Sequence, residues 1–260
     1  HLQCTPSMAR MFTMNDEASA ALAQIKHMMV GGEALPGQLV RDLKALTDAR
    51  ITNMYGPTET TIWSSTEEAK TDEGIVGIGK SIANTQLYVL DAAQNPVALG
   101  AAGELWIGGA GVTRGYWERE DLTQDRYRAD PFRGHGRMYR TGDLVRARLD
   151  GGLDFIGRAD HQVKIRGHRI ELGEIETRLE ALADVKQAVV IAREDTPGDV
   201  RLVAYVCGDA DETTMRQHLD TEVPEYMVPS HFVQLTGFPL TPNKKVDRKA
   251  LPKPVKRSAK

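Results

Sequence analysis

Apolar side chains recur every three or four residues in three segments, which is the spacing of one face of a helix. They follow Pro36 at Leu39, Val40, Leu43 and Leu46, form a stripe at Leu172, Ile175, Leu179 and Leu182, and follow Asp211 at Met215 and Leu219. Proline in a first turn and aspartate at an N-cap both favour helix initiation. The pattern therefore predicts three amphipathic helices.

Shorter apolar or alternating runs predict strands. Between 86 and 149 such runs, for example Gln86–Leu90 and Glu104–Ile107, are broken by Asn95-Pro96 and Gly100, which is typical of antiparallel β structure. Further strands are expected at Arg50–Asn53, Ala188–Ala192, Leu202–Val206 and His231–Leu235, and His1–Pro6 has the pattern of a strand end running into a loop. The last two helices and three strands predict a small α+β unit, with a boundary near Gly157–Gln162.

Composition narrows the class of protein. The chain has 260 residues, of which 41% are hydrophobic and 27% charged, as in a globular protein. Its longest apolar run, Ala188–Ala192, is far shorter than the ~18–20 residues that span a bilayer, and no signal peptide opens the chain. Two cysteines, Cys4 and Cys207, form neither a disulfide framework nor a zinc motif. We expect a cytoplasmic protein without a membrane segment.

The charge is unevenly distributed. Residues 243–260 contain eight Lys or Arg and one acidic residue, Asp247, so that this segment carries +7 while the whole chain carries −3. A basic tail can bind nucleic acid, but this one has no aromatic residue on which a base could stack. A basic segment beside a site for phosphates has the same composition, and we expect no nucleic-acid partner.

Four segments carry residues suited to nucleotide chemistry. The first, Asn53–Thr61, places hydroxyl groups and the Glu59 carboxylate behind a Gly56-Pro57 turn, where they can face phosphate oxygens and Mg²⁺. The second holds Asp143 after a glycine, where a carboxylate can accept ribose hydroxyls. On their own, these two segments are better explained as a surface turn and as an aspartate that stabilises its own turn.

The other two segments are basic. Gly157–Leu172 contains Lys164 to Arg169, with Gly167 at a hairpin turn, and a solvated charged hairpin is the alternative interpretation. Asn243–Arg248 holds Lys245 in a loop, where its spacing alone does not distinguish it from a solvated lysine.

Taken together and in order, the motifs resemble the adenylation domains of nonribosomal peptide synthetases, within the acyl-adenylate-forming superfamily. The resemblance covers almost the whole chain and rests on Asn53–Thr61, Gly103–Tyr116, Tyr139–Leu144, Gly157–Glu176, Pro224–Pro229 and Asn243–Arg248. It implies the end of a large α/β lobe and a β-barrel-like subdomain, followed by a small α+β C-terminal domain. The implied divisions are a core over 1–158 (α/β lobe to about 85, β-rich from 86), a mobile small domain over 159–254 and a basic linker over 255–260.

The resemblance also implies the cofactors ATP and Mg²⁺ and a role for each matching residue. Asn53 and Tyr55 would bind adenine, with Gly56 in the same turn; Thr58 would touch phosphate and Glu59 would bind Mg²⁺. Asp143 would hold the ribose hydroxyls with help from Arg158, and Lys245 would be the catalytic lysine. Asp160 would be a hinge, and Gly167 would line the path of a phosphopantetheine arm carried by a peptidyl carrier protein.

The implied amino-acid pocket lacks an anionic side chain. Its residues are Gln3, Met29, Gly31, Met54, Ile62, Trp63 and Lys245. A cationic substrate side chain would be buried there without a partner, and Trp63 with two methionines fills the volume that a larger one needs. This combination is similar to that of glycine-activating domains, which implies glycine, with alanine next and with Trp63 packed away from the pocket as the alternative.

The sequence departs from the family in two ways. The Gly-rich phosphate loop and the ammonium-binding Asp normally lie upstream of the segment that begins at His1, and Lys244 replaces the usual glycine before the lysine. We therefore expect a C-terminal portion that needs the upstream part of the same domain. Two other hypotheses stay open: an acyl- or aryl-CoA ligase of the same superfamily, and a non-catalytic fragment.

Overall fold

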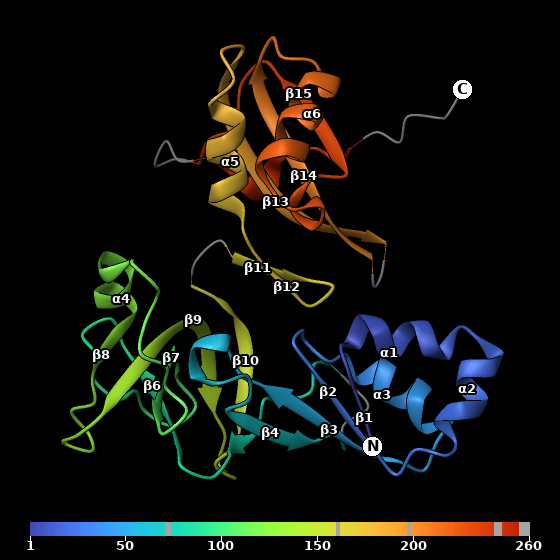
Figure 1. Cartoon of the computed structure of the whole chain (residues 1–260), viewed down its shortest axis with the longest axis vertical. Coiled ribbons are helices and arrows are strands. Elements are labelled where there is room, and N and C mark those ends of the chain that lie inside the picture. The colour runs from blue at the N-terminus through green and yellow to red at the C-terminus, as the bar shows by residue number, and fades with distance from the viewer. Residues whose placement is uncertain (71–73, 160–161, 197–198, 242–245, 255–260) are drawn as a thin grey trace. The chain divides into compact units, whose positions relative to one another are not determined.

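The computed structural model describes residues 1–70, 74–159, 162–196, 199–241 and 246–254. The chain divides into two compact units, His1–Asp160 and His161–Lys260 (Figure 1). Each unit has its own sheets and its own buried cores, and each is described below by itself. No helix in the described ranges is long and apolar enough to cross a membrane.

The first sheet of unit 1 places the strand that opens the motif Asn53–Thr61 at its centre. The strand order is β1-β2-β3-β4-β5, in which the first three strands are parallel and the last two are antiparallel. Their bounds are β1 Leu2–Cys4, β2 His27–Gly31, β3 Arg50–Tyr55, β4 Ser65–Glu68 and β5 Lys80–Ser81. Because parallel strands end at the same edge of a sheet, the turns after β2 and β3 lie at one edge.

Three helices lie beside β1–β3: α1 (Pro6–Thr13), α2 (Asp16–Leu22) and α3 (Gly37–Lys44) (Figure 1). Leu39 and Leu43 of α3 pack with Val30 and Ile51 in one buried cluster, which confirms the helix predicted after Pro36. The sequence did not predict α1 or α2.

The second sheet of unit 1 is antiparallel, as predicted, with the order β10-β9-β7-β6 and β8 paired to β9. Its elements are β6 Thr85–Leu90, β7 Ala102–Gly109, α4 Glu120–Arg126, β8 Tyr127–Ala129, β9 Arg137–Ala147 and β10 Leu153–Arg158. We expected a barrel-like subdomain, but within the described residues this sheet is open. Leu153 of β10 pairs with Gly79, after β4, instead of with β6, so the sheet does not close on itself.

Unit 2 is the predicted α+β unit. The hairpin of β11 (Gln162–Ile165) and β12 (His168–Glu171) leads into α5 (Leu172–Glu180), followed by β13 (Val185–Thr196), β14 (Asp199–Gly208), α6 (Glu212–Glu222) and β15 (His231–Leu235). β14 pairs antiparallel with β13 and parallel with β15. The Asp211 carboxylate accepts a hydrogen bond from the Thr214 amide at 3.0 Å, so it caps α6 as predicted.

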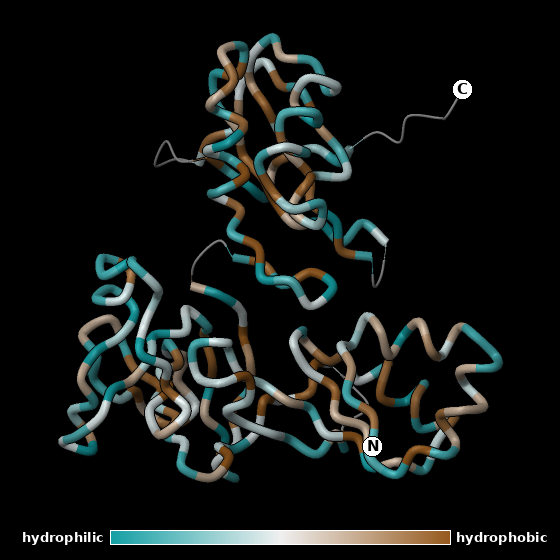
Figure 2. The backbone as a smooth tube through the Cα atoms, viewed as in Figure 1, coloured by the Kyte–Doolittle hydropathy of each residue, from teal (hydrophilic) through white to brown (hydrophobic). Residues whose placement is uncertain are grey.

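Figure 2 shows hydrophobic stretches within unit 2. The apolar runs of β13 and β14 are buried on both sides of their sheet. Val190 and Ala204 pack with Leu179 and Leu219 of the two helices. The alternate positions, such as Val189 and Val203, pack against Leu251 on the other face. Burial on both faces explains why these strands are uninterrupted apolar runs rather than alternating ones.

Candidate functional site

The turn after β3 is tight enough to require glycine. A Cβ at Gly56 would collide with the carbonyl oxygen of Ile62, because the chain folds back on itself here. A single 3-10 turn, Thr58–Thr60, follows Pro57 and exposes Thr58 while it buries Glu59. The candidate phosphate and metal residues therefore stand next to each other at the sheet edge.

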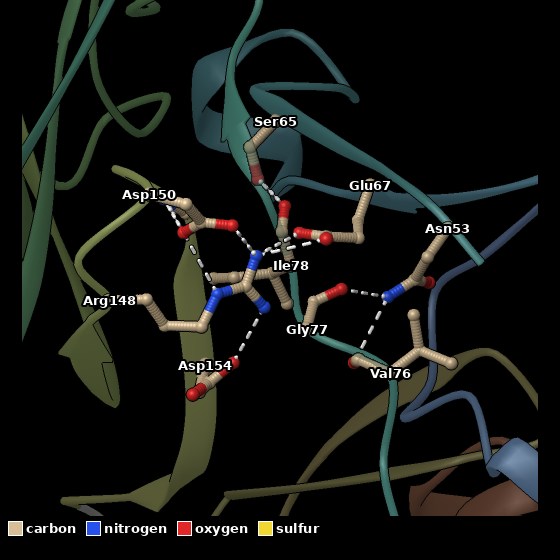
Figure 3. A network of polar contacts seen from close by, with 10 residues as sticks. Asn53, Ser65, Glu67, Val76, Gly77, Ile78, Arg148, Asp150 and Asp154 are labelled. Carbon is tan, nitrogen blue, oxygen red and sulfur yellow. Dashed lines mark hydrogen bonds and ion pairs between the residues drawn. The ribbon is translucent and has the colours of Figure 1, made fainter. Parts of the chain in front are cut away.

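The side-chain amide nitrogen of Asn53 donates hydrogen bonds, while its side-chain oxygen accepts none from the described residues. Its Nδ2 donates to the carbonyl oxygens of Gly77 at 2.8 Å and Val76 at 3.4 Å (Figure 3). Its Oδ1 is buried and has no hydrogen-bond partner among the described residues. A buried acceptor without a donor is costly, so this oxygen is suited to accept a hydrogen bond from a ligand amino group.

The Arg148 side chain lies close to the backbone that accepts the hydrogen bonds of Asn53. The Arg148 guanidinium binds Glu67 of β4 at 2.8 Å and Asp154 of β10 at 2.9 Å, and a Cβ at Gly77 would collide with it (Figure 3). Ser65 Oγ also donates to the Ile78 carbonyl oxygen at 2.6 Å. The segment that orients Asn53 is therefore tied to both sheets of unit 1.

Tyr55, Asp143 and Arg158 meet although they are distant in sequence. The Tyr55 phenol donates to Asp143 Oδ2, and Arg158 Nη1 donates to Asp143 Oδ1 at 2.6 Å. The side chains of Arg158 and Asp143 are only 10% and 4% exposed. Asp143 lies on β9 opposite Arg158 on β10, so the register of these strands creates the ion pair.

Electrostatics keep the Tyr55 phenol protonated. Burial, and then the negative charge of Asp143, raise the pKa of Tyr55 well above its usual range. The phenol is therefore a donor to Asp143, while Arg158 compensates the buried carboxylate. The structure brings these three predicted nucleotide residues together, and the roles that the resemblance gives them stay predictions.

Glu59 is held by two residues, Tyr116 and Thr113, for which the sequence predicted no role. The Tyr116 phenol donates to Glu59 Oε1 at 2.7 Å, and the Thr113 amide donates to the Glu59 carbonyl oxygen at 2.9 Å. Burial, followed by the hydrogen bond to Glu59, raises the pKa of Tyr116 far above its usual range. Thr113 and Tyr116 both lie in the motif Gly103–Tyr116. The motif was part of the predicted resemblance, but it did not predict that these residues would bind Glu59.

The acidic residues present fit Mg²⁺ bound together with a nucleotide. No group of three or more His, Cys, Asp or Glu side chains that could hold a metal occurs in the described part of the chain. Mg²⁺ in nucleotide sites typically takes one or two carboxylates and completes its shell with phosphates and water. Glu59 can supply such a carboxylate beside the turn.

Most candidate amino-acid residues share one face of the first sheet. Gln3 pairs with Met29, and Gly31, two residues further along β2, pairs with Met54. The Trp63 ring lies against Gly31, where a Cβ would be 2.8 Å from two ring carbons. Trp63 is half-buried and Ile62 is 58% exposed. The ring is therefore placed at the predicted residues and not away from them.

Gly167 is the candidate site residue of unit 2 that lies within the described residues. Arg166 and Gly167 form the two-residue loop of the β11–β12 hairpin with φ of 52° and 80°, the geometry of a type I′ turn. This confirms the hairpin turn predicted at Gly167. Two further predicted residues, the hinge Asp160 and the catalytic Lys245, lie outside the described residues, as does the predicted linker 255–260.

The fold and these motifs together define an AMP-binding enzyme. The family model of AMP-binding enzymes matches residues 1–117, and that of the AMP-binding enzyme C-terminal domain matches residues 174–245. The chain belongs to the AMP-binding enzyme family, which confirms the resemblance inferred from the motifs.

Individual relatives are nonribosomal peptide synthetases. The chain is 55% identical over 233 residues to the dimodular nonribosomal peptide synthase of Bacillus subtilis (strain 168), an alignment that covers 87% of this chain and 10% of that protein. The structure of holo-PA1221, described as an NRPS protein containing adenylation and PCP domains bound to a vinylsulfonamide inhibitor, matches with a TM-score of 0.84 and 31% identity. That match covers 95% of this chain and 43% of the other.

Holo-AB3403, a four-domain nonribosomal peptide synthetase bound to AMP and glycine, matches with a TM-score of 0.57 and 44% identity. That alignment covers 100% of this chain and 20% of the other chain. The chain therefore spans a small part of the synthetases that it matches. The adenylate-forming fold predicted from the sequence is confirmed by these structures.

Proposed function

We propose that the chain takes part in the activation of an amino acid by ATP, which yields an aminoacyl adenylate and pyrophosphate. The aminoacyl group then passes to the phosphopantetheine thiol of a peptidyl carrier protein, in nonribosomal peptide synthesis. The observation that carries the proposal is the meeting of Tyr55, Asp143 and Arg158 at the sheet edge that also bears Asn53 and Glu59. Solved relatives that contain carrier domains support the partner.

In this proposal different residues bind different parts of ATP. The unpaired Oδ1 of Asn53 accepts a hydrogen bond from the adenine amino group, Asp143 accepts ribose hydroxyls, and Thr58 contacts phosphate. Bound at Glu59, Mg²⁺ would offset the negative charge that builds up on the phosphate oxygens. Lys245 supplies a further positive charge to the substrate carboxylate and the α-phosphate. For the thiol step, Asp160 is the hinge and Gly167 borders the phosphopantetheine path.

Glycine is the proposed amino acid, with alanine next. The Trp63 ring fills the space over Gly31, which pairs with Met54, and none of the predicted pocket residues carries an anionic side chain. A relative that was solved with AMP and glycine supports the same choice. Since one methyl group contributes only ~1–3 kcal/mol of discrimination, alanine should be a weak second substrate.

Amino-acid-dependent ATP–pyrophosphate exchange tests this proposal in the full-length gene product that carries these residues. The wild type should exchange best with glycine, and Trp63→Ala should gain exchange with larger apolar amino acids because the ring no longer fills the site. Trp117→Ala is the matched control, since Trp117 is 88% exposed and should leave the preference unchanged. A wild-type preference for leucine or phenylalanine would refute the choice of glycine.

The same assay separates the other hypotheses. Exchange with aryl or fatty acids and not with amino acids would identify an acyl- or aryl-CoA ligase. A separate measurement, ATP binding to this chain alone, tests the third hypothesis, because absence of binding would identify a non-catalytic fragment.

Cys4 and Cys207 are both free thiols, which supports the proposed cytoplasmic location.

A further inference from the structure

Two loops of unit 1 are joined around Glu59. The Thr61 hydroxyl donates to the Gly111 carbonyl oxygen at 2.7 Å, the Thr113 amide donates to the Glu59 carbonyl oxygen at 2.9 Å, and the Tyr116 phenol donates to the Glu59 carboxylate at 2.7 Å. The 3-10 turn that carries Glu59 is only three residues long. Its position is therefore fixed by the loop 111–116 as well as by its own hydrogen bonds.

Tyr116 is itself anchored on three sides. Its amide donates to Thr123 Oγ1 of α4 at 2.9 Å, and its ring packs edge-on against Tyr127 with 5.7 Å between ring centroids. Its hydroxyl also lies 3.3 Å from that of Tyr139, a fully buried residue. A phenol held in this way presents its proton in one direction, toward Glu59.

We propose that Tyr116 is a positioning residue that orients the Glu59 carboxylate for the Mg²⁺ of the nucleotide. The inference rests on the proposed function and adds to it a residue that binds neither ATP nor the amino acid. Carboxylates that ligate metals are themselves held by hydrogen bonds, and the loss of such a partner typically costs 10–100-fold in metal affinity or activity. Tyr116→Phe removes one oxygen atom and keeps the ring that packs on Tyr127.

The test measures metal affinity directly and through activity. Binding of Mn²⁺, as a paramagnetic substitute for Mg²⁺, is followed by electron paramagnetic resonance with the non-hydrolysable analogue α,β-methylene-ATP. We expect Tyr116→Phe to weaken Mn²⁺ binding about tenfold or more. The Mg²⁺ concentration for half-maximal pyrophosphate exchange should rise by a similar factor, with excess Mg²⁺ restoring the rate. Unchanged metal affinity, or a lost rate that Mg²⁺ does not restore, overturns the inference.

Tyr127→Phe is the matched control. It removes the phenol that lies 2.8 Å from the Thr113 hydroxyl, in the same aromatic cluster, and keeps the Tyr116 phenol that donates to Glu59. It should lower thermal stability and leave Mn²⁺ affinity unchanged. A tenfold loss of affinity in Tyr127→Phe would show a general effect of the cluster and overturn the specific role of Tyr116.

The double variant Tyr116→Phe/Glu59→Gln covers the case in which Tyr116→Phe does not fold. If the phenol acts through the Glu59 carboxylate, removing the negative charge of that carboxylate restores folding. Failure to restore folding counts against the inference.

Failure of the proposed function can be distinguished from failure of the inference about Tyr116. A wild type that binds Mn²⁺ and nucleotide but exchanges with no amino acid refutes amino-acid activation and leaves the test of Tyr116 intact.

Discussion

At the scale of single residues, Asp143 depends on its hydrogen-bond partners. Its carboxylate is buried, and it receives hydrogen bonds from both Tyr55 and Arg158. Its amide donates to Thr141 Oγ1 at 3.0 Å, and Thr141 Oγ1 donates to the Leu105 carbonyl oxygen at 2.7 Å. A buried charge is tolerated only with such a set of donors, so each donor is needed for stability as well as for ligand binding.

Replacing Tyr55 with phenylalanine tests this dependence. The change leaves one buried oxygen of Asp143 without its phenol donor, which should destabilise the protein by about 1–3 kcal/mol in urea unfolding. It should also raise the KM for ATP, because the carboxylate is free to turn toward Arg158 alone. Tyr88→Phe is the control: Tyr88 lies on β6, and its phenol donates to Asp130 at 2.8 Å instead of to a predicted nucleotide residue. It should lower stability without changing the KM, and a raised KM in Tyr88→Phe would contradict the assignment.

Among elements, the turn between β3 and β4 holds the clearest backbone strain. Thr61 and Ile62, two consecutive β-branched residues, have φ of 63° and 72°. Such residues avoid the left-handed region, at a cost of roughly 1–2 kcal/mol each. Hydrogen bonds across the base of the turn, such as Ser64 amide to Tyr55 carbonyl oxygen at 2.8 Å, offset this cost and direct Trp63 back over Gly31.

Ile62→Gly should therefore stabilise the fold, unlike most substitutions by glycine. Relief of the left-handed strain gains roughly 1–2 kcal/mol, while the added freedom of the unfolded chain costs roughly 0.5–1 kcal/mol. Because the Ile62 side chain is 58% exposed, little packing is lost. Thermal unfolding should show a small rise in Tm, and Ile156→Gly, which changes a 46% exposed isoleucine in β10, should show a fall. A fall in both variants would mean that the turn is not strained.

The elements found from the sequence were those with a strong period or a cap. Leu172–Leu182 and Asp211 marked α5 and α6, because each helix buries a regular apolar stripe, and the run His231–Leu235 marked β15, whose apolar side chains are half-buried. Helix α1 was missed because it has only eight residues and exposes two of its apolar side chains, Met8 and Met11, so that apolar positions alone do not mark its buried face.

The site was predictable only in part, for a related reason. The motifs named Tyr55, Asp143 and Arg158 through resemblance, but their contact depends on strand register and on the approach of residues 88 positions apart. The Tyr116–Glu59 bond likewise joins residues 57 positions apart. No local pattern encodes such a pairing.

Across the whole molecule, buried residues separate by unit. Each hydrophobic cluster in the described residues takes its members from one unit alone: two clusters lie in unit 2 and three in unit 1. Leu219 of α6 and Leu43 of α3 are both fully buried, one in each unit. A core that is complete within its unit can be weakened without removing contacts from the other core.

Leu219→Ala and Leu43→Ala test this separation as a matched pair. Each leaves a cavity in a fully buried helix position, which typically costs about 2–5 kcal/mol. Because the two leucines belong to different clusters, hydrogen exchange followed by mass spectrometry should show faster exchange in β13 and β14 for Leu219→Ala, and in β2 and β3 for Leu43→Ala. The opposite unit should keep its wild-type exchange in each case. If either variant speeds exchange in both units to the same degree, the two cores unfold as one cooperative body and the separation is wrong.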